Sequence, residues 1–182
     1  EEIEGKIDRA LDVGTRYLGM PLGFLTKIDD GTQRIVQVTG DHPLIQPEET
    51  CPLDEAYCRR TVETEDALAV QDAEVSTAIS DAAVRRFDLG TYIGAKITVN
   101  DEVYGTVCFA DEEQRSGAFT DADTFFVELI ARLVGQTFER RKYERELTER
   151  KERLNKQREI YRAVIDASFD FVFRIDPDGR FT

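Results

Sequence analysis

The segment from Tyr92 to Asp111, YIGAKITVNDEVYGTVCFAD, constrains the fold more than any other part of the chain. Two runs of alternating, strand-favouring residues flank a polar turn at 100–102, which predicts an antiparallel hairpin. Phe119, Thr120 and Asp121 then begin an amphipathic helix, with Thr120 or Asp121 as its N-cap. A hairpin connected directly to a long helix is the arrangement expected of a small-molecule sensor that signals to a distant output, and no catalytic motif competes with it.

The helix that begins near residue 121 is predicted to be unusually long. It contains no proline up to about Ile165, and only Gly135 weakens it. About 45 residues at 1.5 Å each would span about 65 Å, which is longer than a single small domain. We therefore expect this helix to extend beyond the domain in which it begins.

Apolar side chains are scarce between residues 139 and 159, and those that remain are spaced as in a coiled coil. Leu147, Leu154 and Tyr161 lie seven residues apart, and Tyr143 lies four residues before Leu147. This heptad seam predicts a parallel homodimer through the helix. The partner positions 150 and 157 are polar, so the coiled coil should be weak. The alternative is a solvated single helix.

Shorter patterns predict the remaining elements. Apolar residues on one face predict a helix over 3–19, and the turn signal at 29–32 predicts a hairpin of strands at 24–28 and 34–39. A loop over 40–52, a short helix over 53–64, a strand over 67–71 and a helix near 82–87 come next. Residues 167–182 change to a period of two, which predicts the first strands of a second domain.

The composition is acidic, with 37 Asp and Glu against 24 Lys and Arg and a formal net charge of −13. Binding phosphates needs clustered cations, so we expect no nucleic-acid partner. Only six of the 24 cations are lysines, and such an acidic, lysine-poor surface suits a salty, halophilic cytosol that screens self-repulsion. No apolar run is long enough to span a bilayer and no signal pattern precedes the first helix, which predicts a cytoplasmic protein without direct membrane contact.

The chain contains three cysteines, Cys51, Cys58 and Cys108, and one histidine, His42. There is no CxxC pair and the histidine stands alone, so the sequence supports no zinc site. Three scattered cysteines also do not form a disulfide framework. His42 precedes a proline in the predicted loop, where we expect a solvated side chain rather than a haem ligand. The sequence identifies no cofactor.

Over residues 3–138 the sequence resembles the GAF domain, a ligand-binding sensor fold. The segments that carry the resemblance are DGTQRIVQVTG (30–40), YCRRTVETEDALAVQDA (57–73), IGAKITVNDEVYGTVCFAD (93–111) and FTDADTFFVELIARLVGQ (119–136). ASFDFVFRIDPDGRF (167–181) similarly resembles the opening of a PAS domain. The resemblance implies an α+β fold with a six-stranded antiparallel sheet, helices on one face and a pocket on the other. The chain would then comprise a GAF-like domain at 1–138, a coiled-coil linker at 139–166 and a PAS-like fragment at 167–182.

Alternation in the predicted hairpin separates an apolar face from a mixed one. The apolar face should pack on the terminal helices, and its members are Ile93, Ala95, Ile97, Val99, Val103, Gly105, Val107 and Phe109. The mixed face has the few polar groups among aromatic rings that a ligand site requires. The candidate pocket residues are Cys58, Asp72, Tyr92, Lys96, Tyr104, Thr106 and Cys108.

Several of these candidates have a structural alternative. Lys96 could meet a ligand carboxylate or phosphate, or it could extend to the sheet edge or pair with Asp72. Asp72 follows a strand and is expected to cap the next turn. Cys58 and Cys108 could form a redox- or metal-responsive pair, although buried free cysteines mostly behave as small hydrophobes.

Subclasses of the family with known ligands match poorly. Bilin attachment in photoreceptor GAF domains uses a Cys followed by His, whereas Arg59 follows Cys58. The end of the cyclic-nucleotide pattern Asn-Lys…Phe-x3-Asp-Glu is echoed by Phe119 and Asp123, but its Asn-Lys pair and its Glu are missing. Free methionine-R-sulfoxide reductases share the GAF fold and use three cysteines. Cys51 and Cys58 resemble two of these, but no cysteine lies between residues 72 and 90.

Together these patterns predict a non-catalytic module that senses an unidentified small molecule in a signal-transduction protein. The usual tandem of GAF and PAS modules suggests a histidine kinase of a two-component system as the parent. Pocket occupancy would pass through a dimeric helix to an output beyond residue 182. Two alternatives are a dimerisation spacer whose pocket is filled by side chains, and a GAF-fold methionine sulfoxide reductase.

Overall fold

The computed structural model describes residues 2–169 of the chain. The chain divides into two units, residues 1–139 and 140–182. The predicted PAS-like strands after residue 169 lie outside the described residues.

The first unit alternates helices and strands along the chain. Its elements are α1 (Glu2–Leu18), β1 (Leu22–Asp29), β2 (Thr32–Thr39), β3 (Thr50–Pro52), the 3-10 helix η1 (Leu53–Glu55), α2 (Cys58–Glu63), β4 (Leu68–Val70), α3 (Asp81–Phe87), β5 (Thr91–Val99) and β6 (Glu102–Asp111), followed by the beginning of α4 (Asp121–Phe169). The short strand β3 lies inside the segment predicted to be a loop. The helix predicted over 53–64 is divided into η1 and α2.

The six strands of the described chain form one sheet in the order β3-β2-β1-β6-β5-β4, and every neighbouring pair is antiparallel. Two tight hairpins build its centre. Asp30 and Gly31 join β1 to β2 with φ of 44° and 71°, and Asn100 and Asp101 join β5 to β6 with φ of 52° and 65°. Two consecutive positive φ angles match the twist of the flanking strands. The predicted α+β fold with a long C-terminal helix is confirmed.

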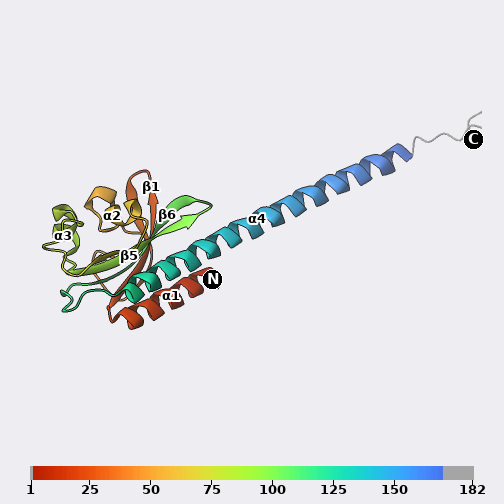
Figure 1. Cartoon of the computed structure of the whole chain (residues 1–182). Coiled ribbons are helices and arrows are strands. Elements are labelled where there is room, and N and C mark those ends of the chain that lie inside the picture. Colours follow the sequence, from red (N-terminus) through yellow and green to blue (C-terminus); the bar gives the residue numbers. More distant parts are fainter. Residues whose placement is uncertain (1, 170–182) are drawn as a thin grey trace, which may run out of the picture. The chain divides into compact units, whose positions relative to one another are not determined.

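Helices α1 and α4 lie side by side on one face of the sheet, whereas α2 and α3 lie on the other (Figure 1). The rings of Tyr17 on α1 and Phe126 on α4 stack with centroids 4.1 Å apart. We call the apolar side chains between these helices and the sheet the helix-side cluster; it includes Leu11, Leu25, Ile93, Ile97, Val107, Phe109, Val127 and Val134. Most of the predicted apolar face of the hairpin is therefore where the sequence placed it.

Two glycines let the helices approach the sheet closely. A Cβ at Gly14 on α1 would lie 2.2 Å from Cζ of Phe109, and a Cβ at Gly135 on α4 would lie 2.4 Å from the Thr98 carbonyl oxygen. Gly135 thus serves the contact between helix and sheet, and α4 continues through it as one helix.

The start of α4 is closed by a reciprocal pair of hydrogen bonds. The Thr120 N–H donates to Asp123 Oδ2 at 2.8 Å, and the Asp123 N–H donates to Thr120 Oγ1 at 3.2 Å. This arrangement is a capping box with Asp in the third position. Of the two predicted N-caps, Thr120 is the one used.

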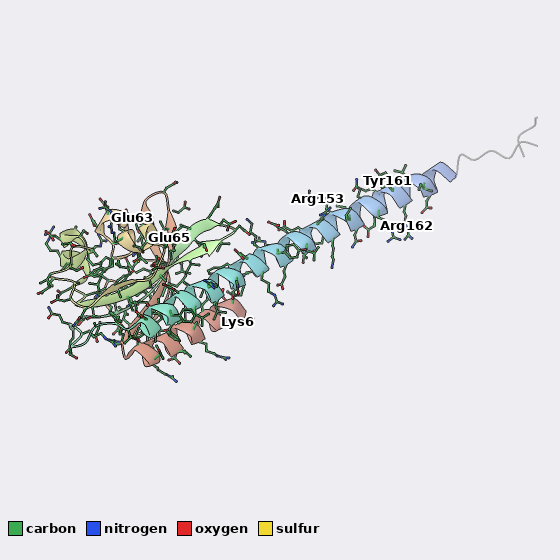
Figure 2. The ribbon with its side chains drawn as sticks, viewed as in Figure 1. Lys6, Glu63, Glu65, Arg153, Tyr161 and Arg162 are labelled. Atoms are coloured by element: carbon green, nitrogen blue, oxygen red, sulfur yellow. The ribbon has the colours of Figure 1, made fainter. Side chains whose placement is uncertain are left out.

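In the second unit the described residues are those of α4 from 140 to 169. Ion pairs spaced four residues apart support the helix, among them Arg140–Glu144 and Arg145–Glu149 at 2.8 and 3.4 Å. The four predicted seam residues are 42–68% exposed, and they are Tyr143, Leu147, Leu154 and Tyr161. Figure 2 shows Tyr161 projecting from this part of the helix. Within residues 2–169, no helix combines the length and the hydrophobicity that a membrane-spanning helix requires.

Candidate functional site

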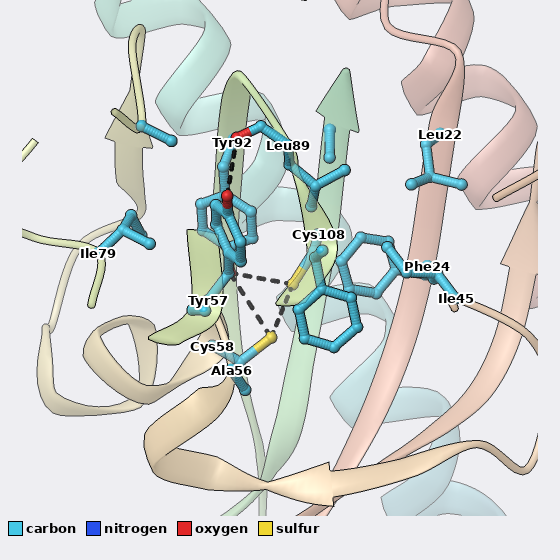
Figure 3. Close-up of a cluster of buried hydrophobic side chains, with 14 of the residues drawn as sticks. Leu22, Phe24, Ile45, Ala56, Tyr57, Cys58, Ile79, Leu89, Tyr92 and Cys108 are labelled. Atoms are coloured by element: carbon cyan, nitrogen blue, oxygen red, sulfur yellow. Dashed lines mark hydrogen bonds between the residues drawn. The ribbon is translucent and has the colours of Figure 1, made fainter. Parts of the chain in front are cut away.

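The sheet face opposite α1 and α4 carries a second buried cluster, which we call the pocket-side cluster. Helix α2 packs on β5 and β6, and α3 packs on η1. The cluster includes Phe24, Ile45, Tyr57, Cys58, Phe87, Leu89, Tyr92 and Cys108 (Figure 3). Cys58 is the first residue of α2, so its thiol lies where this helix packs on the hairpin of β5 and β6.

Two cysteines and a tyrosine meet in this cluster. Cys58 Sγ lies 3.4 Å from Cys108 Sγ, and the Tyr92 hydroxyl lies 3.1 Å from Cys108 Sγ and 3.7 Å from Cys58 Sγ (Figure 3). The Tyr92 hydroxyl also bonds the Thr61 hydroxyl at 2.8 Å. These side chains are at most 1% exposed. Hydrogen bonds buried this deeply are strong and also costly to break.

Two threonines extend the network across the sheet. The Thr106 hydroxyl donates to Cys58 Sγ at 3.0 Å and accepts the Cys108 S–H at 3.1 Å. Thr106 faces Thr26 across β1 and β6, with their hydroxyl oxygens 2.7 Å apart. The Thr106 N–H donates to Thr26 Oγ1 at 3.2 Å. The polar groups of Thr26, Tyr92, Thr106 and Cys108 therefore surround Cys58, and we call them the polar cage.

This cage separates the acidities of the two thiols. Burial raises the pKa of a thiol, but the neighbouring Cys108 thiol and the hydrogen bonds that Cys58 receives from Thr106 and Tyr92 hold its pKa below the ordinary value. Burial, followed by the neighbouring Cys58, raises the pKa of Cys108 well above its usual range. The pKa of Tyr92 is also raised well above normal, mainly by burial. Within the pair, Cys58 is the group that carries a negative charge more easily.

A small cavity adjoins Cys58. It is lined by Phe24, Gln33, Ile45, Tyr57, Cys58, Phe87 and Leu89, and the centre of a water molecule has about 10 Å³ of space in it. Gln33 is 3% exposed, and its Nε2 lies 3.7 Å from Cys51 Sγ. Its Oε1 is buried without a hydrogen-bond partner in the described chain. A buried unpaired acceptor costs about 1–3 kcal/mol, which a bound donor would offset.

The structure brings together four of the seven predicted pocket residues, namely Cys58, Tyr92, Thr106 and Cys108. Asp72 is not among them, because its Oδ1 accepts the Glu74 N–H at 3.0 Å and closes a turn. Lys96 is half-buried and lies in a groove of about 410 Å³ at the sheet edge. The groove is also lined by Glu65 and Glu128.

Tyr104 was predicted on the pocket side, and this prediction is wrong. The register of β5 and β6 shifts between Ile97 and Thr98, where Ile97 faces Gly105 and Thr98 faces Val103. Tyr104 is the extra residue, so the alternation reverses there. Its ring packs on Phe138 of α4 with centroids 4.6 Å apart. The same shift leaves Val103 45% exposed, although the alternation predicts it in the core.

The expectation of a solvated His42 is also wrong, since its side chain is buried. His42 Nδ1 accepts the Leu44 N–H at 3.2 Å, so Nε2 carries the ring proton and donates it to the Phe87 carbonyl at 2.9 Å. His42 thereby fastens the loop after β2 to the end of α3. A single histidine before a proline gives no signal of this role in the sequence.

Gln33, Thr26 and Thr61 were not predicted as site residues. Thr26 shares a face of β1 with Phe24, and a small hydroxyl on an apolar strand face is the one sequence signal that points to the cage. Gln33 stands in a polar stretch of β2, where nothing distinguishes it from an exposed residue. Among the described residues, no group of three or more His, Cys, Asp or Glu side chains is arranged to hold a metal ion.

Solved structures resemble this chain in fold. The GAF domain of PixJ from Thermosynechococcus elongatus, in its blue-light absorbing form, matches with a TM-score of 0.67 and 10% identity over 81% of this chain and 91% of that chain. The GAF domain of a phosphoenolpyruvate-protein phosphotransferase from Coxiella burnetii matches with a TM-score of 0.64 and 15% identity, over 78% of this chain and 85% of that chain. Free methionine-R-sulfoxide reductase from Neisseria meningitidis, in complex with its substrate, matches with a TM-score of 0.60 and 11% identity, over 77% of this chain and 81% of that chain. Identities this low show the shared fold alone.

The sequence comparison identifies the family. Among curated proteins, none matches the chain. The family profile of the GAF domain matches residues 2–139, which are the elements from α1 to the first part of α4. With the sheet order and the two-sided packing described above, the chain belongs to the GAF domain family, a sensory and regulatory fold of signalling proteins.

Proposed function

We propose that this GAF domain senses a small molecule on its pocket side and transmits the event through its terminal helices. The observation that carries the proposal is the position of Cys108 and Phe109, which are neighbours in β6. Cys108 lies in the polar cage of the pocket side, and Phe109 fills the space left by Gly14 of α1 on the other side. A displacement of β6 at this point would change the contacts of Cys108 on the pocket side and those of Phe109 with α1 on the other side.

The sheet offers few ways to absorb such a displacement locally. β6 pairs with β5 from Glu102 to Asp111 and with β1 from Gly105 to Ala110, and both Cys108 and Phe109 are fully buried. Closely packed interiors transmit small shifts because they have no free volume to take them up. A ligand that favours one position of β6 would therefore favour one packing of α1 and α4.

We further propose that the chain acts as a homodimer through α4. Tyr143, Leu147, Leu154 and Tyr161 are all exposed in the single chain and lie on one heptad seam. Apolar side chains at this spacing become buried when two such helices associate. A signalling protein with an output such as a histidine kinase would use this paired helix to transmit the change.

The test is ligand-dependent stability of the protein and of Gln33→Leu. A ligand at one hundred times its dissociation constant adds about 2.7 kcal/mol to the free energy of unfolding, so a metabolite panel should contain a compound that raises the melting temperature by several degrees. Gln33→Leu should abolish that shift, because the ligand loses the Oε1 acceptor. A panel without any shift, or a shift retained in Gln33→Leu, contradicts the proposal.

One observation favours a spacer as the second candidate. The cavity beside Cys58 accommodates about one water molecule, because Phe24, Tyr57, Phe87 and Tyr92 fill the pocket side. In a spacer, Gln33→Leu would only remove an unpaired polar atom and would be neutral or stabilising. The absence of any ligand response in the panel would then be the expected result.

A reductase has weaker support. Cys51 is only 5% exposed, and Cys58 contacts Cys108. Cys108 lies on β6, whereas the reductase pattern would need its third cysteine between residues 72 and 90. We propose that this segment is not an enzyme. Turnover of free methionine sulfoxide by the reduced protein would contradict that proposal.

A further inference from the structure

The thiols of Cys58 and Cys108 are in direct contact. Their sulfur atoms are 3.4 Å apart, and the two residues come from α2 and β6, fifty residues apart in the sequence. A disulfide needs a separation of about 2.05 Å, so the atoms would have to approach by about 1.4 Å. Both thiols are free and buried.

The hydrogen bonds give the two thiols different roles. The Thr106 hydroxyl donates its single hydrogen to Cys58 Sγ, so Thr26 is the donor in the bond between the two threonine hydroxyls. Thr106 in turn donates to Cys58 Sγ and accepts from the Cys108 S–H. Cys58 is thus an acceptor that is ready to be a thiolate, whereas Cys108 keeps its proton. The thiolate is the form of a cysteine that an oxidant attacks, and the neighbouring protonated thiol holds the proton that can leave with water once Cys58 is oxidised.

The cavity determines what can reach Cys58. With about 10 Å³ for a water centre, the cavity has room for a molecule near the size of water. The unpaired Gln33 Oε1 offers an acceptor for one O–H of such a molecule. The surrounding side chains are apolar apart from Gln33, Tyr57 and Cys58. Hydrogen peroxide has the size and the two O–H donors that this site accommodates.

We propose that peroxide oxidises Cys58 and Cys108 to a reversible disulfide, and that this pair is the sensing element of the pocket. The inference rests on the proposed sensory function and names its signal. The Cys58 thiolate attacks one peroxide oxygen, the O–O bond breaks, and the departing hydroxide takes up the proton lost by Cys58 to become water. Cys108 sulfur then attacks the sulfur of the Cys58 sulfenic acid, and the second water leaves with the Cys108 proton. Peroxide gains the two electrons that the thiols lose.

The new bond would act on the route described above. It would tie the first residue of α2 to β6, which α2 already packs against. Phe109, the next residue on β6, fills the space beside Gly14 of α1. The oxidised and reduced proteins should therefore differ in the packing of α1 against the sheet.

The test treats the reduced full chain with hydrogen peroxide, alkylates the remaining thiols and maps the peptides by mass spectrometry without reduction. We expect a Cys58–Cys108 linked peptide, an alkylated Cys51, and recovery of all three thiols with dithiothreitol. Cys51→Ser is the matched control and should form the same linkage at the same rate. Three alkylated cysteines, a linkage to Cys51, or oxidation beyond sulfenic acid without a disulfide would overturn the proposal.

Two variants separate the roles of the thiols. Cys108→Ser should leave Cys58 trappable as a sulfenic acid by dimedone and form no linkage. Thr106→Val removes the hydroxyl that donates to Cys58 and should slow disulfide formation about tenfold, and an unchanged rate would contradict the assigned proton arrangement. Circular dichroism checks that each variant is folded, and the linked peptide in the unaltered chain does not depend on any variant.

The outcome is distinguishable from a failure of the sensory function. If the thiols stay free under peroxide while a metabolite stabilises the protein, the peroxide inference is overturned and the sensor remains. If the disulfide forms but the amide exchange of α1 is the same in both redox states, the pair is oxidisable without signalling, and the sensory role of the pair is overturned.

Discussion

Gly5 and Gly135 both lie inside helices, and the structure gives them opposite roles. A Cβ at Gly5 would meet no atom within 4 Å, whereas a Cβ at Gly135 would lie 2.4 Å from the Thr98 carbonyl oxygen. The neighbour of Gly135 is backbone of β5, which cannot move aside without displacing the strand. The missing side chain of Gly135 is therefore what allows α4 to pack this closely against β5.

We therefore predict opposite effects of the same substitution at the two positions. Gly135→Ala should lower the free energy of unfolding by about 1–3 kcal/mol, because the clash separates α4 from the sheet. Gly5→Ala is the matched control and should raise it by about 0.5–1 kcal/mol, since alanine is the better helix former. Urea denaturation measures both. A stabilising Gly135→Ala would mean that α4 does not approach Thr98 this closely.

Cys51 predicts an alkaline effect on stability. Burial raises its pKa from 9.0 to about 11, although Arg86 opposes the shift. The unfolded chain thus loses this proton first, so the contribution of the buried thiol is complete below pH 9 and is lost between pH 9 and 11. Its full size is at most about 2–3 kcal/mol.

The measurement is the unfolding free energy of the protein and of Cys51→Ala at several pH values. The loss of stability from pH 9 to 11 should be smaller in Cys51→Ala, even if the variant is less stable at neutral pH. Tyr57, whose pKa burial raises to about 12, remains in both proteins and adds the same loss to each above pH 10. Parallel curves would show that Cys51 ionises as readily in the folded chain as in the unfolded one.

At the scale of elements, the start of α4 depends on two side chains. Thr120 and Asp123 each accept the backbone N–H of the other. Thr120→Ala should cost about 1 kcal/mol of stability because one helix-end N–H loses its partner. Thr137→Ala, inside the same helix, is the matched control and should be neutral or slightly stabilising. Equal effects in thermal denaturation would contradict the capping role.

The elements also show where sequence reasoning succeeds and where it ends. The hairpin of β5 and β6 and the length of α4 were predictable, because alternation, a two-residue turn and an uninterrupted helical pattern are local signals. The strand β3 was not, since three residues that end in a proline give no period. The register shift beside Ile97 was not predictable either, because alternation carries no sign of an extra residue. Tyr104 was therefore predicted on the wrong face of the sheet.

The candidate site was predicted in part for the same reason. Thr106 and Cys108 alternate along β6, and Tyr92 lies on the same face of the sheet in β5, so their grouping follows from alternation. Their contact with Cys58 depends on how α2 lies over the sheet, which is a long-range property of the fold. The buried Gln33 is likewise placed by the layer above it rather than by its own neighbours in sequence.

At the scale of the whole molecule, the seam on α4 predicts the oligomeric state. Leu147→Glu with Leu154→Glu should convert a dimer to a monomer, because it sets like charges against each other at two positions of the seam. Thr148→Glu with Asn155→Glu adds the same charge one position away and should remain dimeric. Light scattering measures the mass of each. A dimer that survives the leucine changes would place the interface elsewhere.

Coupling between the two faces of the sheet is the central claim, and amide hydrogen exchange tests it most directly. The experiment compares the protein with and without the compound that gives the largest thermal shift, with Gln33→Leu as the control. We predict changed protection in α1 and in residues 121–139 of α4, on the face opposite the cavity, and no change in Gln33→Leu. Changes confined to α2, α3 and the loops around the cavity would contradict the account.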